Sequence, residues 1–576
     1  MILKTPYTPL DMDFLIKKHF ATLLVLVIMG AAGCARPERK GDSDDGVEGL
    51  PNILWLVAED LSPVIAPFGD STIVTPHLSR LAEEGVRYTN VYSICGVCSP
   101  SRSALATGMY PTRIGSHHMQ IGNIPPAMKS NPAIMNFIRQ YMPEGLDPYE
   151  VVPPPYVKMH SEYLRELGYY CSNNAKEDYQ FAPSPFSWDE SSATAHWRNR
   201  EEGQPFFAVF NFMITHESRI WMKAQDSLWV DADLEVPIPS YLPDTEISRK
   251  DIRRMYSNVA EMDHRVGELL QQLEADGELE NTIIFWYTDH GGPLPRQKRL
   301  LYDSGLKVPM IIRFPGSNGA GSVDDQMISF IDFLPSIISL AGIDPPEYLD
   351  GKAFLGKYKA TKERHFIHAA ADRFDEHADM IRGVRNERFK YLRNYNPQKG
   401  YYLPLSFREQ MALMQEMLQM RDAGTLDEIE SLWFRSSKPE EELFDCINDP
   451  EELYNLADDP QYAEILSELR AECSRWMEEV DDKGFVNEHE MVKQFWPGRI
   501  QPVTSDPSLQ EEAQKIIAIS TDEAGSYLGY QLVEDGDTLS SQWEIYTEPV
   551  KLKNQQQLYA IAHRKGYLPS QIVKWD

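Results

Sequence analysis

Cysteine is scarce in this chain, with only six among 576 residues. Cys95 and Cys98 form a C-x-x-C pair, but no second pair accompanies them, so the spacing does not predict a zinc site. A redox-active dithiol is the alternative interpretation of this pair, although its surroundings are not thioredoxin-like. Cys446 and Cys473 could form a disulfide if the protein is exported, which the sequence leaves open.

Positive charge is also in short supply. The sequence has 56 Lys and Arg against 87 Asp and Glu, which gives a net charge of −31. A negative field of this size argues against nucleic acid as a partner, because phosphate backbones are themselves anionic. It does not exclude an anionic substrate, since a local basic pocket dominates at short range.

The third shortage is of long apolar runs. Residues 20–29 are apolar but too few to span a bilayer comfortably. Lys17 and Lys18 precede this run, and small residues lead from it to Cys34, as in a bacterial lipoprotein signal. We therefore predict a signal peptide over 1–34, with Cys34 as the lipidation site, and a polar tether over 35–50. The protein is expected to be exported, as a periplasmic or cell-surface lipoprotein of a bacterium that meets the membrane only through its lipid anchor.

Apolar and aromatic residues are plentiful, at 42% and 11%, which is enough for a large globular core. An amphipathic pattern over 253–273 predicts a long helix. Continuous apolar runs predict strands that are buried on both faces, as in a parallel sheet, at 52–58, 206–212, 282–287 and 308–314. Residues 51–365 are thus predicted to form an α/β domain, a mostly parallel sheet flanked by helices.

The pattern changes after residue 340. A strand over 382–395 and helices over 407–433 and 462–480 predict a smaller α+β subdomain, residues 366–499. From residue 500 short strands alternate with turn residues, which predicts a terminal β-sandwich module over 500–576. We interpret this module as accessory packing.

Polar side chains follow three of the predicted buried strands. Glu59 and Asp60 end the first, His216 follows the second, and Asp289 with His290 ends the third. Three carboxylates at one sheet edge would repel one another, and a divalent cation relieves that repulsion. Oxygen-rich ligation with one histidine favours calcium or magnesium over zinc. The alternative is that each acid caps a helix after its strand.

Basic residues and a cysteine lie near the same strand ends in the sequence. Arg102, Lys176 and Lys298 have the charge and the donors to bind a tetrahedral anion. Cys98 precedes Pro100 and a helix expected from Ser101, whose amino end favours nearby negative charge. An ordinary thiol in a turn, among solvated surface cations, is the plainer interpretation.

The run Cys98-Ser99-Pro100-Ser101-Arg102 with Thr107-Gly108 resembles the type I sulfatase signature C-x-P-x-R…T-G. Further blocks of that family appear in order between residues 51 and 488, and they look most similar to the bacterial heparan N-sulfatase-like subgroup. The resemblance implies an alkaline-phosphatase-like fold and a Cys98 that a formylglycine-generating or equivalent maturation enzyme converts to formylglycine.

The resemblance also implies roles for single residues. A calcium ion would be held by Glu59, Asp60, Asp289, His290 and the group derived from Cys98. Arg102 would orient the formylglycine hydrate, Lys176 and Lys298 would bind the sulfate, and His216 would give a proton to the leaving group. An oxygen of the hydrate would attack sulfur, and the second hydroxyl would then expel the sulfate.

Two positions depart from the family pattern. Glu59 stands where aspartate is usual, and Asp178 occupies the usual position of a histidine. Substrate contacts are expected in polar stretches that we interpret as loops, since loops carry specificity. The candidate substrate-binding residues are His117, His118, Asp178, Asp372, Arg373 and His377.

The expected activity is therefore removal of sulfate from a sulfated oligo- or polysaccharide, with the choice between O-sulfate and N-sulfate open. A phosphonate monoester hydrolase or phosphodiesterase of the same superfold is one alternative. A non-catalytic, glycan-binding surface lipoprotein with an unmodified Cys98 is the other.

Overall fold

A mixed sheet built around β1 (Asn52–Ala58) organises the first two thirds of the chain. The computed structural model describes residues 49–119, 131–534 and 536–575, and within these ranges nine strands form this sheet in the order β4-β3-β5-β1-β6-β7-β2-β8, with β9 paired to β2. The other strands are β2 (Val86–Tyr92), β3 (Tyr170–Asn174), β4 (Glu190–Ser191), β5 (Phe206–Phe212), β6 (Thr282–Thr288), β7 (Lys307–Arg313), β8 (Ser322–Asp324) and β9 (Ile328–Ser329).

Most neighbours in this sheet run parallel. The strands β3, β5 and β6 run in the same direction as β1, whereas β7 is antiparallel to both β6 and β2. The prediction of a mostly parallel α/β sheet is confirmed. Its four buried strands were placed to within one residue, because a strand covered on both faces reads as one continuous apolar run.

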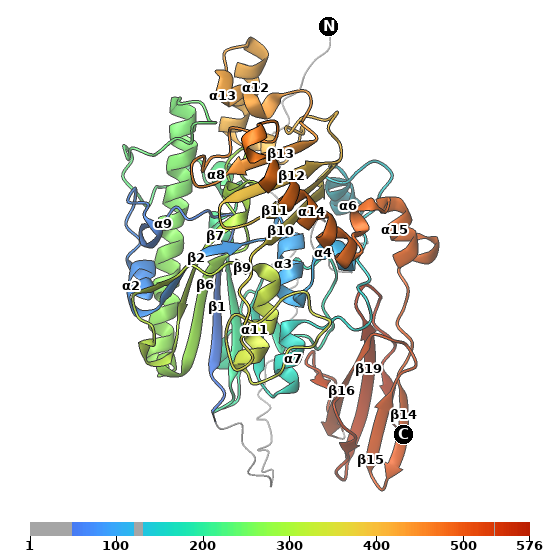
Figure 1. Ribbon diagram of the computed structural model, residues 1–576. Helices are drawn as coiled ribbons and strands as arrows, with labels where there is room; N and C mark the ends of the chain where they lie inside the picture. The colour runs from blue at the N-terminus through green and yellow to red at the C-terminus, as the bar shows by residue number, and fades with distance from the viewer. Residues whose placement is uncertain (1–48, 120–130, 535, 576) are drawn as a thin grey trace. The chain divides into compact units, whose positions relative to one another are not determined.

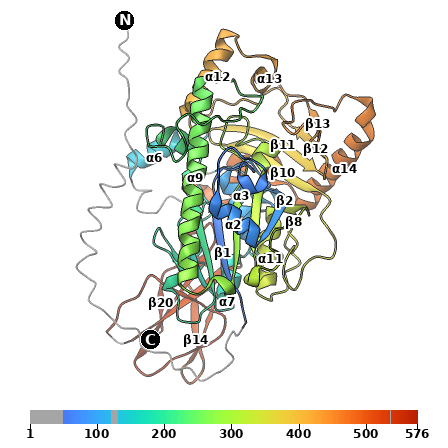
Figure 2. The same ribbon diagram turned by 90° about the vertical axis from the view of Figure 1, so that its left-hand side faces the viewer.

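Helices cover both faces of the sheet, as Figures 1 and 2 show. Leu54 and Leu56 of β1 belong to one core cluster with α2 (Pro76–Glu84) and α9 (Glu246–Ala275). The alternate residues Ile53, Trp55 and Val57 pack on the other face, against α3 (Cys98–Thr107), α7 (His160–Glu166) and α11 (Phe333–Leu340). The long helix begins earlier than predicted, since Thr245 accepts a hydrogen bond from Ser248 N–H as its N-cap. The shorter helices are α4 (Pro111–Ile114), α6 (Pro132–Arg139), α8 (Ser218–Met222) and α10 (Asp303–Leu306).

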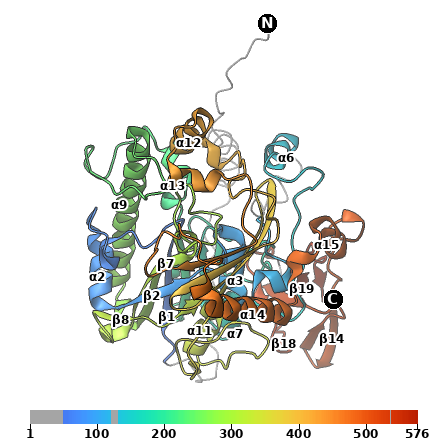
Figure 3. The same cartoon turned by 45° about the horizontal axis from the view of Figure 1, so that its top comes forward.

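A second, antiparallel sheet lies beyond the carboxyl ends of β1 and β6 (Figure 1). It consists of β10 (Ile367–Phe374), β11 (His377–Arg385), β12 (Phe389–Asn394) and β13 (Glu441–Asp445). The helix α14 (Ala463–Val480) contacts β11 and β12 (Figure 3), and α15 (Glu488–Phe495) follows it.

Several predictions in this region are wrong in detail. The single strand expected over 382–395 is two strands, because Asn386 Oδ1 accepts from the amides of Arg388 and Phe389 and turns the chain. The long helix expected over 407–433 is broken into α12 (Ala412–Ala423) and α13 (Glu428–Ser431), where Gly424 takes a left-handed conformation with φ of 68°. Cys446 and Cys473 are free thiols, so the suggested disulfide is not formed.

Two small antiparallel sheets end the chain, as predicted for a β-sandwich. One contains β14 (Ser508–Ala513), β15 (Ile516–Ser520) and β18 (Val550–Lys551), and the other β16 (Ser526–Glu534), β17 (Glu544–Ile545), β19 (Gln556–Arg564) and β20 (Val573–Lys574). Residues 50–576 form one compact unit, and the proposed domain boundaries inside it stay predictions.

Cys34, the predicted signal peptide and nearly all of the tether lie outside the described residues. Among the residues that are described, no helix is both long enough and apolar enough to cross a membrane.

Candidate active site

The ends of three neighbouring strands bring the predicted acidic residues together. Because β1 lies between β5 and β6 in parallel register, Ala58 is level with Phe212 and Thr288, and the residues that follow each strand meet at one edge. Asp60 N–H donates to Asp289 Oδ1 at 3.1 Å, and Glu59 N–H donates to Thr215 Oγ1 at 3.0 Å. Three separate stretches of sequence therefore form one site.

Cys98 enters this site as the first residue of α3, which begins three residues earlier than predicted. Its Sγ lies 3.4 Å from His290 Nε2, 3.7 Å from Lys298 Nζ and 3.9 Å from Asp60 Oδ1, and the side chain is buried. Ser101 Oγ donates to the carbonyl of Asp289 and ties the helix to the end of β6. The positive end of the helix therefore faces the carboxylates.

The donor set fits a divalent cation. Asp60, Cys98, Asp289 and His290 each offer one atom, and these atoms all lie within 4.8 Å of one another. Atoms that surround calcium at its usual ligand distances are at most about 5 Å apart. His290 Nδ1 lies 3.1 Å from the carbonyl oxygen of Gly291, an arrangement that leaves Nε2 for a metal.

Glu59 lies beside this set. It forms a second possible group with Asp60, Cys98 and His216, and its Oε1 is a buried carboxylate oxygen without a hydrogen-bond partner. An orphaned carboxylate oxygen of this kind is a suitable metal ligand. The longer side chain at this position thus still reaches the cluster.

Each acid of the cluster has its own basic partner, and all these side chains are buried or nearly so. Lys298 Nζ lies 2.6 Å from Asp60 Oδ2, Lys176 Nζ lies 2.9 Å from Glu59 Oε2, and Arg102 Nε lies 3.0 Å from Asp289 Oδ2. The three basic residues predicted to bind an anion are therefore brought together with the acids.

These partners control ionisation. Burial alone would raise the pKa of Asp60, but Lys298, His216 and His290 hold it well below its usual value. Burial likewise opposes ionisation of Asp289, yet His290 and Arg102 lower its pKa to about 2. Both carboxylates are charged at neutral pH, as metal ligands must be.

His216 lies at the edge of the cluster and is neutral. Burial and the neighbouring Lys298 lower its pKa to about 3. Its Nε2 is 3.2 Å from Lys298 Nζ, and its Nδ1 is 2.9 Å from Ser218 Oγ. Nδ1 also accepts from the Ser218 backbone N–H at 3.3 Å. Because the ring is neutral and the Lys298 ammonium lies against Nε2, this geometry does not support His216 as the sole proton donor.

Asp178 is hydrogen-bonded to Ser99, the residue after Cys98. Its Oδ1 accepts from Ser99 Oγ at 2.5 Å, and its Oδ2 is 3.9 Å from Lys176 Nζ. The side chains of Asp178, Lys176 and His216 are 13%, 16% and 14% exposed, whereas the cluster behind them is sealed. These three residues thus mark where the site opens to solvent.

The other candidate substrate residues are not brought to the cluster. The stretch predicted as a loop is the hairpin β10–β11, in which Asp372 pairs with Arg382 at 3.0 Å and Arg373 pairs with Glu488 at 2.7 Å. His117 and His118 are buried with ring centroids 4.2 Å apart. The loop prediction is wrong for 371–377, because paired charges let polar strands enter the interior, and it is confirmed for His117 and His118, which lie outside helices and strands. The predicted contact of these residues and of His377 with substrate stays a prediction.

Two residues near the site were missed in the sequence. Glu217 N–H donates to Asp60 Oδ2 at 2.7 Å, and the Glu217 carboxylate pairs with Arg299 at 2.8 Å and with Lys298 at 3.4 Å. Asn211 Oδ1 accepts from Arg102 Nη1 at 2.7 Å. Their positions in the sequence could have indicated them, since Glu217 follows His216 directly and Asn211 is the second-last residue of β5.

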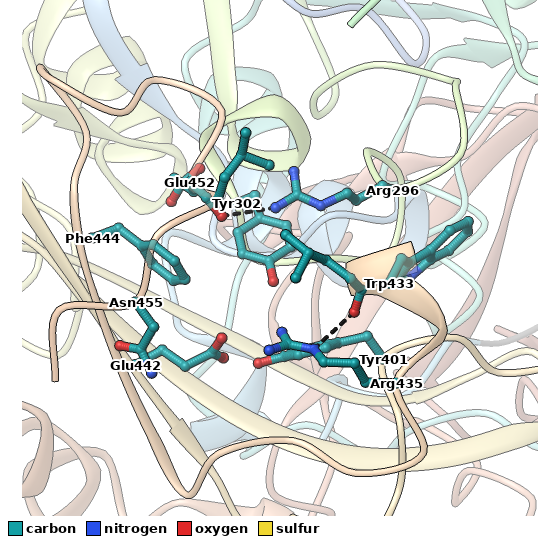
Figure 4. A pocket seen from close by; sticks show the side chains of 11 residues that line it. Arg296, Tyr302, Tyr401, Trp433, Arg435, Glu442, Phe444, Glu452 and Asn455 are labelled. Atoms are coloured by element: carbon teal, nitrogen blue, oxygen red, sulfur yellow. Dashed lines mark hydrogen bonds between the residues drawn. The ribbon is translucent and has the colours of Figure 1, made fainter. Parts of the chain in front are cut away.

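A separate cavity of about 60 Å³ is lined by Arg296, two residues before Lys298 (Figure 4). There the Arg296 guanidinium lies 4.2 Å from the centre of the Tyr302 ring and donates to the carbonyls of Glu451 and Glu452. None of the ligand candidates lines this cavity. This cavity therefore adds no group to the site.

Comparisons with known proteins agree with this site. The Sulfatase family profile matches residues 51–343, which hold every group of the cluster, and the profile of the N-sulphoglucosamine sulphohydrolase C-terminal region matches 296–422. The chain belongs to the sulfatase family. It is 49% identical, over 91% of both chains, to an ulvan-active sulfatase from Formosa agariphila. The human N-sulphoglucosamine sulphohydrolase is 24% identical, over 75% of this sulfatase and 90% of the human one.

Solved structures confirm the fold predicted for this sulfatase. A structure bound to D-glucosamine-2-N,6-O-disulfate matches 76% of the chain and all of its own, with a TM-score of 0.53 and 17% identity. A phosphonate monoester hydrolase from Silicibacter pomeroyi matches 76% of the chain and 97% of its own, with a TM-score of 0.51 and 16% identity. The fold is thus shared across two reaction types, and the relatives identify this chain as a sulfate ester hydrolase.

Proposed function

We propose that this sulfatase removes sulfate from an ulvan-type sulfated polysaccharide, with a formylglycine derived from Cys98 and one calcium ion per site. The observation that carries the proposal is the position of Cys98, at the start of α3 and within 4 Å of His290, Lys298 and Asp60. The substrate class rests on the relative that is 49% identical, which is far nearer than the 24% of the N-sulphoglucosamine enzyme.

Calcium would be held by Asp60, Asp289, His290 and the group derived from Cys98, with Glu59 as a further oxygen ligand. When bound, it would supply Lewis-acid polarisation of the sulfate oxygens. The aldehyde hydrate made from Cys98 by a maturation enzyme would supply the attacking oxygen.

The chain's own residues bind the anion and move the proton. Lys176 at the opening and the buried Lys298 behind it hold the sulfate by charge and hydrogen bonds, and Arg102 keeps the end of α3 oriented through Asp289. Lys298 stays protonated, because Asp60 raises its pKa although burial would lower it. The Lys298–His216 pair therefore delivers the proton to the leaving sugar oxygen.

The test is mass spectrometry of the peptide that contains Cys98, combined with desulfation assays on ulvan, heparan sulfate and a phosphonate ester. The proposal predicts the aldehyde in protein from the native host and release of sulfate from ulvan first. An unmodified thiol with no desulfation would support a non-catalytic glycan-binding protein, and faster turnover of the phosphonate would support a phosphonate hydrolase.

We also propose that the protein is exported and anchored through Cys34. The support is the order of basic, apolar and small residues before that cysteine. Labelling of growing cells with radioactive palmitate should mark the wild type and not Cys34→Ala. Equal labelling of both would contradict the anchor.

A further inference from the structure

Phe407 lies beside His216, at the side where the site opens, and two further aromatic side chains pack against Phe407. The Phe407 ring lies 6.2 Å from His216, 5.3 Å from Trp221 and 5.9 Å from Tyr141, measured between ring centres and all edge-on. All three aromatic side chains are half-buried, so part of each ring remains at the surface. They come from distant parts of the chain: after α6, within α8 and before α12. The fold therefore assembles an aromatic surface next to a residue that takes part in the proposed proton transfer.

The segment that carries Phe407 is held in place by the β10–β11 hairpin. His377 Nε2 lies 3.2 Å from the carbonyl oxygen of Pro404, and Glu376 accepts from Ser406 N–H at 2.7 Å. Asp375, in the same turn, pairs with Arg299, the residue after Lys298. The same hairpin therefore contacts both the segment that carries Phe407 and the residue next to Lys298. Such shared support is what a preorganised contact requires.

The chemistry of this surface suits a sugar ring. The catalytic cluster supplies charge for the sulfate and almost no apolar area, whereas a pyranose also presents faces of C–H groups. Aromatic rings offer apolar area with a negative face, and small-ligand sites combine such walls with a few polar groups. His216 marks the side from which the oxygen of the sulfated sugar departs, so the sulfated unit lies against His216 and the next sugar along the chain extends towards Phe407.

We propose that Phe407, supported by Trp221 and Tyr141, packs against a sugar ring of the polysaccharide that neighbours the sulfated unit, and so favours polymeric over small substrates. This rests on the proposed sulfatase function. Phe407 would then be a specificity-determining residue that touches substrate without taking part in the chemistry. The role also explains why a large aromatic side chain is left half-exposed at this point.

The experiment compares Phe407→Ala and Phe407→Leu with the wild type on ulvan oligosaccharides and on 4-nitrophenyl sulfate, which has no neighbouring sugar. The loss in kcat/KM should be about tenfold larger on the oligosaccharide than on the aryl sulfate, mostly as a rise in KM. Phe407→Tyr should restore the oligosaccharide value, because it keeps the ring. Trp229→Ala is the matched control, an indole that is 47% exposed and packs on His264, away from the site.

Equal losses on both substrates would show that Phe407 only positions His216 and would overturn the proposal, as would no loss on the oligosaccharide. Phe407→Leu keeps the apolar volume, so it separates a loss of folding from a loss of the ring. Failure of the wild type on every sulfated substrate would refute the proposed function itself. A wild type that desulfates oligosaccharides with a Phe407→Ala variant of the same KM would refute only this inference.

Discussion

A buried ion pair joins the terminal β-sheets to α7, and its removal gives a sharp test of the fold. Lys565 Nζ lies 2.8 Å from Glu162, whose carboxylate also accepts from Ser187 Oγ at 2.7 Å and from Met159 N–H at 2.9 Å. Glu162 is fully buried, the lysine side chain is 3% exposed, and the Tyr527 ring lies 4.0 Å from the ammonium. The pair therefore lies in an interior formed by residues some 400 positions apart.

The expected cost follows from what each substitution leaves behind. Removal of one partner of a buried ion pair costs about 3–5 kcal/mol. Lys565→Met leaves Glu162 with two hydrogen bonds, so we expect the lower end, about 3 kcal/mol. In Glu162→Gln the lysine can give up its proton, because burial already lowers its pKa, and we expect about 2 kcal/mol. The double variant leaves no unpaired buried charge. Its free energy of unfolding should therefore fall by about 2 kcal/mol less than the sum of the two single losses.

The assay is urea unfolding followed by tryptophan fluorescence, with free energies from linear extrapolation. Hydrogen exchange of β16 and β19 would show whether these strands open first. Lys493→Met, which removes an exposed ion pair with Glu490, is the control and should leave the midpoint unchanged. A loss below about 1 kcal/mol for Lys565→Met, or single losses that simply add, would refute the view that the terminal sheets share a buried interior with α7.

Four further predictions concern the site and one buried acid. Cys98→Ala should abolish sulfate release while the circular dichroism spectrum stays unchanged; residual turnover above the uncatalysed rate would contradict the nucleophile. Asp289→Asn should lower turnover and weaken calcium binding in titration calorimetry, since it removes a charged ligand candidate, and unchanged affinity would contradict the ligand set. Asp178→Asn keeps the acceptor for Ser99 but not the charge, and kcat should fall about 100-fold if the carboxylate assists proton transfer; an unchanged kcat would leave it a purely structural role. Burial raises the pKa of Glu442 from 4.5 to about 7, so its stabilising protonation is complete below pH 4.5 and is lost as pH rises through 7; Glu442→Gln should remove about 3 kcal/mol of this dependence, seen as a smaller difference in Tm between pH 5 and 8.

The sequence predicted those parts of the molecule whose physics is local. The strands at 52–58 and 206–212 were placed correctly, because burial on both faces leaves no polar position to blur the run. β2 was not predicted, because Arg87, Thr89 and Asn90 interrupt its apolar residues. The strand β10 and the first half of β11, residues 377–381, were hidden for a related reason. They carry buried charges such as Arg373, and a charge is read as exposed when its partner, here Glu488, is distant in the sequence.

The site shows the same division. The acids were found because strand ends of a parallel sheet meet at one edge, and the motif around Cys98 supplied the rest. What could not be read was the pairing between groups. Burial and Lys298, which comes from a different loop, lower the pKa of His216, and the position of Asp178 depends on its hydrogen bond from Ser99. Both are tertiary contacts without a sequence signature.

This pairing bears on why the proposed cation would be needed at all. Glu59, Asp60 and Asp289 are already balanced by Lys176, Lys298 and Arg102, one base to each acid. A divalent cation is therefore not required to relieve repulsion among the acids, as their spacing in sequence had suggested. It would instead give the balanced cluster a net positive charge, in a buried place where charge acts strongly on a bound anion. The acids position the cation, and the bases keep Asp60 and Asp289 ionised, whereas burial raises the pKa of Glu59 in spite of Lys176 and Arg102. The surplus charge faces the sulfate at the opening between Lys176 and His216. On this reasoning, removal of calcium should weaken anion binding far more than it weakens the fold.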